Sequence, residues 1–108
     1  MATSIIKTHT GTLVTPTVPG YVELLQNKSM VYPSGQKLIQ VQLHFTQSVP
    51  TNWTILGLPS ALQTNAYVGI TVIYTNSGEV YGANINGNVV SLKKAAPAGW
   101  YVLSVMYE

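Results

Sequence analysis

Carboxylate side chains are scarce in this sequence, and they are the first place to look for acid–base chemistry. Most glycoside hydrolysis needs two of them flanking the scissile bond. The candidates are Glu23, Glu79 and Glu108. Glu79 follows an Asn-Ser-Gly turn and Glu108 ends the chain, so no acid–base pair is apparent and we expect solvated side chains.

Histidine and serine offer little more. His9 and His44 are the two histidines, and the chain has no Asp and no Cys. A zinc site would therefore need Glu23 or a second chain, for example copies of His44 meeting on a trimer axis. The simpler interpretation of His44 is a surface or interface residue. No G-x-S-x-G elbow, Walker A motif or dinucleotide-binding glycine pattern is present. We predict no enzymatic activity, no cofactor and no metal.

Aromatic side chains are the remaining chemical resource. Seven Tyr and two Trp accompany many Asn, Thr and Gln. Aromatic faces stack on the apolar faces of sugars, while amides and hydroxyls bond the hydroxyl groups. Trp53 and Trp100 are by residue type more often core than ligand platforms, so we expect both to be buried.

The low charge excludes other classes of partner. Charged residues make up 7% of the chain, against roughly 25% in an ordinary soluble domain. The net charge of +2 comes from scattered lysines, of which only Lys93 and Lys94 are adjacent. Nucleic-acid binders cluster basic residues on one face, so we predict no nucleic-acid binding. No apolar run approaches the roughly 18 residues of a membrane helix, and the N-terminus lacks the apolar core of a signal peptide.

Alternation of apolar and polar residues predicts the elements that carry these groups. Residues 37–46 place Ile39, Val41, Leu43 and Phe45 on one face and Gln40, Gln42, His44 and Thr46 on the other. A turn at 30–36 and a weaker strand at 21–25 precede this segment. Further strands are expected at 66–74, 80–85, 88–92 and 100–108. Asn86-Gly87 predicts a hairpin in which both central residues have positive φ.

The absence of a capped helical period completes the prediction of an all-β fold. Short strands separated by regular turns favour a small antiparallel β-barrel or sandwich. Residues 1–20, Thr-rich with Pro16 and Pro19, are expected to be an arm or linker with an edge strand as the alternative. We expect residues 21–108 to form the single domain.

Residues 31–108 resemble the C-terminal receptor-binding head module of bacteriophage tail fibre and baseplate proteins. The segments that carry the resemblance are "PSGQKLIQVQL", "NWTILGLPSAL", "NSGEVYGANINGNVVSL" and "WYVLSVMY". In that family the Trp-to-Leu-Pro segment is mainly structural. The resemblance implies that Trp53 and its aliphatic neighbours pack into the barrel, and that Pro59 ends the strand because it has no N–H to donate.

The resemblance also implies a function. A homotrimeric head, at the tail tip or baseplate of a virion and in contact with other tail or baseplate proteins, would attach to saccharides of a bacterial cell envelope. A structural virion subunit and a cellular lectin-like module are the alternatives. No family site residue can be carried over, so exposure reasoning selects the candidates: first Tyr74, Asn76, Tyr81, Asn84 and Asn86 around the hairpin, then His44 and Trp100.

Overall fold

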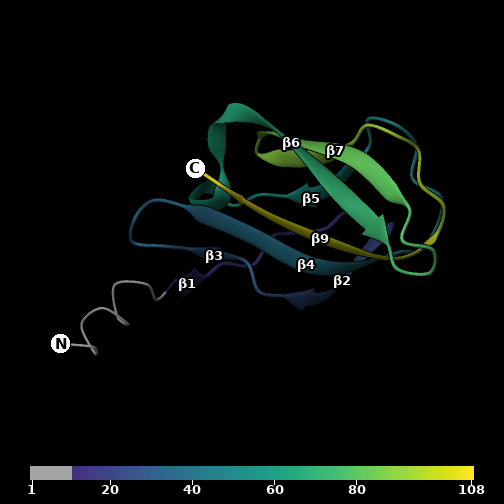
Figure 1. Ribbon diagram of the computed structural model, residues 1–108, viewed down its shortest axis with the longest axis horizontal. Helices are drawn as coiled ribbons and strands as arrows, with labels where there is room; N and C mark the ends of the chain where they lie inside the picture. The colour runs from purple at the N-terminus through teal and green to yellow at the C-terminus, as the bar shows by residue number, and fades with distance from the viewer. Residues whose placement is uncertain (1–10) are drawn as a thin grey trace.

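The chain folds as an all-β domain, as predicted, and Figure 1 shows its strands wrapped around one core. The computed structural model describes residues 11–108. The elements in chain order are β1 (Thr12–Leu13), β2 (Val22–Asn27), β3 (Met30–Val31), β4 (Lys37–Phe45), β5 (Thr54–Gly57), the 3₁₀ turn η1 (Ser60–Leu62), β6 (Thr64–Tyr74), β7 (Val80–Gly87), β8 (Val89–Leu92) and β9 (Gly99–Tyr107).

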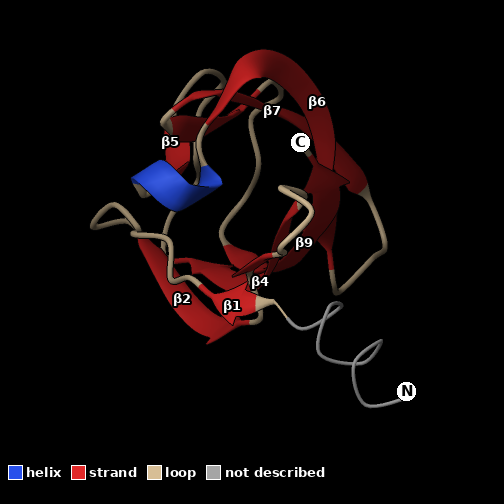
Figure 2. Cartoon of the chain, turned by 90° about the vertical axis from the view of Figure 1, so that its left-hand side faces the viewer, coloured by secondary structure: helices blue, strands red, loops and turns tan. Residues whose placement is uncertain are grey.

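The strands form one curled antiparallel sheet. Its order is β1-β3-β4-β9-β6-β7-β8-β5, and β2 pairs with the same edge of β4 as β3 does. Figure 2 shows this sheet bent into a half-barrel. Backbone hydrogen bonds in both directions between Thr17 and Gly57 connect β5 to the segment before β2. Of the arm expected at 1–20, the first ten residues lie outside the described ones; the remainder contains β1 and Thr17.

The pair β4–β9 forms one wall of the domain and positions the site discussed below. The two strands pair over their whole length, from Lys37 opposite Tyr107 to Phe45 opposite Gly99. The alternation predicted for residues 37–46 is confirmed, because Ile39, Val41, Leu43 and Phe45 are all buried. In β4 from Ile39 onward, and in β9 as far as Leu103, the odd-numbered residues thus face the core. The even-numbered residues of the same two segments face outward.

The β7–β8 hairpin is confirmed, but its turn lies one residue later than predicted. Asn86 still pairs with Val89, which leaves Gly87 and Asn88 as the central residues. Gly87 has φ 63°, whereas Asn88 does not have positive φ. Glycine at the first central position is the pattern of a type II′ turn, which matches the twist of the flanking strands. The expectation of two positive φ angles is therefore wrong.

The segment "NWTILGLPSAL" is only in part a core segment. Ile55 and Leu56 are both fully buried, because a bulge between Thr54 and Leu56 shifts the register against β8. Trp53, however, is 43% exposed and packs on the Tyr21 ring at a centroid distance of 5.1 Å. It follows a turn in which Asn52 has φ 71°, and it lies before the strand enters the core. The expectation that Trp53 is buried is wrong.

Candidate functional site

The residues first predicted as a ligand site lie in three separate places. Tyr74, Asn76 and Tyr81 flank the β6–β7 turn, and Asn86 is at the opposite end of β7. Asn84 lies between them on the β7 wall. Tyr81 and Asn84 were expected to be exposed, and this expectation is wrong, because they are only 4% and 3% exposed.

Tyr81 belongs to a structural cluster at one end of the half-barrel. Its hydroxyl donates to the Glu79 carboxylate at 2.5 Å, and Lys94 lies 3.8 Å from Glu79 and 5.0 Å from the Tyr81 ring centroid. The bond to Glu79, together with burial, raises the pKa of Tyr81 to about 12. The Glu79 side chain is 52% exposed, in agreement with the expectation that it is solvated, and it also contacts these two neighbours.

Stacked aromatic rings complete this cluster. Tyr101 stacks between Phe45 and Tyr74, with centroid distances of 4.3 and 5.0 Å. Its hydroxyl donates to the carbonyl of Pro97, and burial raises its pKa. Asn76 donates to the Tyr74 hydroxyl at 3.3 Å. The polar atoms of these rings are already bonded within the domain, which indicates that the cluster closes the end of the sheet.

Asn84 faces away from the core but is covered. It is opposite Gly69 on β6 and Ser91 on β8. Its Oδ1 atom has no hydrogen-bond partner in the described part of the chain. An unpaired buried amide oxygen costs about 1–3 kcal/mol. Because the side chain is buried, a surface ligand does not reach it in this structure.

The second-choice residues, His44 and Trp100, are brought together on the outer face of β2, β4 and β9. They are cross-strand neighbours, and their rings stack at 4.4 Å with an interplanar angle of 17°. Glu23 is opposite His44 on β2, and its Oε1 atom lies 2.5 Å from His44 Nδ1. The carboxylate orients the imidazole, which in turn supports the indole from one side.

Trp100 is exposed, which contradicts the expectation from residue type and agrees with its selection as a second-choice candidate. It is 51% exposed because its register opposite His44 places it on the outer face of β9. The row Glu23–His44–Trp100 therefore crosses three strands and ends in an accessible aromatic surface. This is a platform on which the apolar face of a flat ligand can stack.

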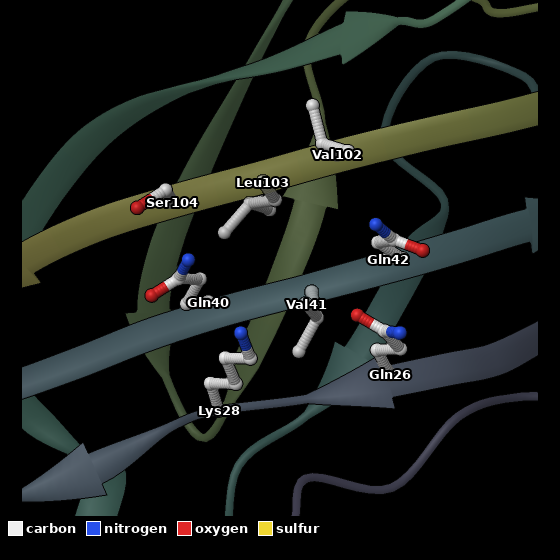
Figure 3. A pocket seen from close by; sticks show the side chains of 8 residues that line it. All are labelled: Gln26, Lys28, Gln40, Val41, Gln42, Val102, Leu103 and Ser104. Atoms are coloured by element: carbon white, nitrogen blue, oxygen red, sulfur yellow. The ribbon is translucent and has the colours of Figure 1, made fainter.

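A groove lies beside this platform on the same face, and Figure 3 shows the side chains that line it. It has a volume of about 290 Å³, and its outward-facing side chains are Gln26, Lys28, Gln40, Gln42, Val102 and Ser104. A neighbouring hollow of about 260 Å³ shares Gln42 and Val102 with it and reaches Leu25, Thr75 and Trp100. We call the two hollows together the β4–β9 groove.

The β4–β9 groove combines an aromatic ring with amides that both donate and accept hydrogen bonds. At about 3.3 Å per residue, Trp100 and Ser104 lie about 13 Å apart along β9. The alternating pattern placed Gln40 and Gln42 on the polar face, but it gave no reason to select them as a site. Gln26 belongs to β2, and only the register Gln26–Gln42 brings it alongside.

A metal centre is not assembled in the described residues. No three His, Cys, Asp or Glu side chains come together within residues 11–108. Glu23 and His44 form a pair, and their contact serves to orient the imidazole.

Comparison of the chain with protein-family models, curated proteins and solved structures found no match. Within residues 11–108, no helix is both long and apolar enough to cross a membrane. The geometry of the β4–β9 groove is therefore the observation that bears on function.

Proposed function

We propose that the domain is a non-enzymatic saccharide-binding head, and that the β4–β9 groove is its binding site. The observation that carries the proposal is an exposed indole, supported by the imidazole of His44, at one end of a groove lined by three glutamine amides. This combination matches the two surfaces of a sugar, one apolar and one rimmed with hydroxyls.

The side chains of the groove are held in place before a ligand binds. His44 stacks on Trp100 and is itself held by Glu23, so little rotational freedom remains to be lost when a ligand binds. Gln40 and Gln42 project from a strand that is paired on both sides, which fixes the spacing of their side chains. Apart from Lys28, the outward-facing side chains that line the groove are uncharged, and their amides suit hydroxyl-rich ligands.

For the biological setting, we propose the receptor-binding head of a bacteriophage tail tip or baseplate, assembled as a homotrimer and attached to bacterial envelope saccharide. The resemblance of residues 31–108 to such modules supports this setting. Three copies would raise the strength of individually weak sugar binding through multivalency. Light scattering coupled to size exclusion tests the assembly: a mass near three times 11.7 kDa is expected, and a stable monomer would contradict it.

The binding site is tested by comparing two exposed aromatic residues. Trp100→Ala removes the platform, whereas Tyr67→Ala removes an aromatic side chain of similar exposure on β6. On a glycan array and in a host-cell binding assay, we expect Trp100→Ala to abolish binding and Tyr67→Ala to retain it. Absence of saccharide binding by the unmodified protein in both assays would overturn the proposal.

A structural role in the virion is the second candidate, and an apolar patch favours it. Ile73 and Val80 are cross-strand neighbours that are both exposed, and Val102 is opposite Ile73 on β9. Such a patch suits contact with another protein. Binding to virions that lack this protein, combined with no binding to cells or glycans, would favour the structural role.

A further inference from the structure

The β4–β9 groove contains a cation that no carboxylate neutralises. Lys28 lines the groove, and Figure 3 shows its side chain pointing toward β4, on which Gln40 lies. The three glutamate side chains lie elsewhere. Glu23 contacts His44, and Glu79 contacts Tyr81 and Lys94. Glu108 lines a separate hollow together with Lys37. In the described residues, Lys28 forms no ion pair.

The backbone at Lys28 is held in place by a set of hydrogen bonds. Lys28 N–H donates to the carbonyl of Gln40 at 2.8 Å. The fully buried Ser29 accepts from the Gln40 N–H at 3.2 Å and donates its own N–H to Asn27 Oδ1 at 3.0 Å. Asn27 in turn donates to the carbonyl of Val14 at 2.9 Å. The step between β2 and β3 is therefore fixed, and it anchors Lys28 beside the groove.

We propose that the β4–β9 groove selects an acidic saccharide, whose anionic group pairs with Lys28 while one of its sugar rings stacks on Trp100. This inference rests on the proposed function and specifies its ligand class. The anionic group is a carboxylate or a phosphate, and the Gln40 amide adds a neutral donor beside Lys28.

The geometry also sets a minimum ligand length. Gln40 is opposite Ser104, which lies about 13 Å along β9 from Trp100. The backbone of Lys28 bonds to Gln40 at this level of the sheet, so a single sugar ring stacked on the indole does not also lie beside Gln40. We therefore expect a linear oligosaccharide, with the acidic group on a different sugar from the stacked ring.

The experiment compares oligosaccharides that differ in charge and in the kind of anionic group. Isothermal titration would use a tetragalacturonate, its uncharged methyl ester, and a galactose tetramer that carries phosphate monoesters, called the phosphate oligomer below. We expect the methyl ester to bind more weakly than the acid, and the difference to shrink at 0.3 M salt because the Debye length falls below about 8 Å. Stronger binding of the phosphate oligomer would assign the anion as phosphate, and stronger binding of the uronate as carboxylate.

Matched variants assign the effect to Lys28. Lys28→Gln should weaken binding of the acidic ligand about two- to fivefold, as expected for an exposed ion pair, and leave the methyl ester unchanged. Lys93→Gln makes the same charge change at the end of β8, away from the groove, and should have no effect. Trp100→Ala should weaken binding of both ligands.

Two results would overturn this inference, and they are distinguishable. Equal affinity for acid and ester, with Trp100-dependent binding and no effect of Lys28→Gln, would overturn the acidic specificity while leaving the saccharide-binding proposal in place. No binding of any of these ligands, or of the neutral saccharides of the glycan array, would overturn both.

Discussion

Gly99→Ala is the substitution for which the structure gives the most definite expectation. Gly99 begins β9 with φ 148°, a conformation that L side chains rarely adopt. A Cβ atom there would lie 2.5 Å from Tyr74 Cε1 and 3.0 Å from its hydroxyl. Tyr74 is stacked on Tyr101 and cannot move without disturbing that contact.

The two effects can be added as an estimate. The backbone strain costs about 1–3 kcal/mol and the overpacking about 1–3 kcal/mol, so the free energy of unfolding should fall by about 2–6 kcal/mol. That is a large part of the roughly 5–15 kcal/mol available to such a domain. At about 4 °C or more per kcal/mol, the melting temperature should fall by at least about 8 °C.

Urea denaturation followed by tryptophan fluorescence, together with a thermal scan, measures both quantities. Gly69→Ala is the matched control, because a Cβ at that exposed strand glycine meets nothing within 4 Å. It should change stability by no more than about 0.5 kcal/mol. If Gly99→Ala were as stable as Gly69→Ala, the predicted packing of Tyr74 on Gly99 would be refuted.

Three further substitutions test other parts of the fold. Gly57→Ala would place a methyl group against the Thr17 hydroxyl and should lower the free energy of unfolding by about 1–3 kcal/mol. In a double-mutant cycle measured by urea denaturation, adding Thr17→Ala should recover part of that loss, and strict additivity of the two substitutions would contradict the contact. Burial raises the pKa of Tyr107 to about 12, above about 10 in the unfolded chain. The unfolded chain loses this proton first, so the contribution of Tyr107 to the free energy of unfolding is complete below pH 10 and is lost as pH rises toward 12. Tyr107→Phe should therefore flatten the fall of the urea midpoint between pH 10 and 12, and an unchanged slope would count against this effect. Because Asn52 has φ 71°, Asn52→Ala should cost about 1 kcal/mol in thermal unfolding whereas Asn52→Gly should not, and equal effects would refute the conformational argument.

Local pattern was sufficient for the longer strands, but it missed β5 and the two-residue β3, which lies within the turn predicted at 30–36. It was also insufficient for the placement of aromatic residues. The alternation at 37–46 depends only on which residues face the core, so it predicted β4 correctly to within one residue. The exposure of Trp53 and Trp100 depends on a turn and on a cross-strand register, which residue type does not encode. In the β7–β8 turn only Gly87 has positive φ, because Asn86 remains paired with Val89 in the ladder. Local pattern does not encode this register either.

The candidate site illustrates the same limit at longer range. His44 and Trp100 were selected separately, and the β4–β9 register makes them one stacked pair. Gln26 and Lys28 were not selected, because they are distant in sequence from β9 and reach the groove only through the pairing of β2 with β4. By contrast, Tyr81 was expected on the surface, although its alternation on β7 matches the buried Ala83 and Ile85. Applying the alternation to that strand would have excluded it.

Nuclear magnetic resonance titration with an oligosaccharide tests the central claim most directly, since the two indole N–H signals serve as internal comparison. If the β4–β9 groove is the binding site, the Trp100 indole and the side-chain amides of Gln26, Gln40 and Gln42 should shift, while the Trp53 indole should not. Shifts confined to Trp53, or to Asn76 and Asn86 at the two ends of β7, would contradict the assignment of the groove.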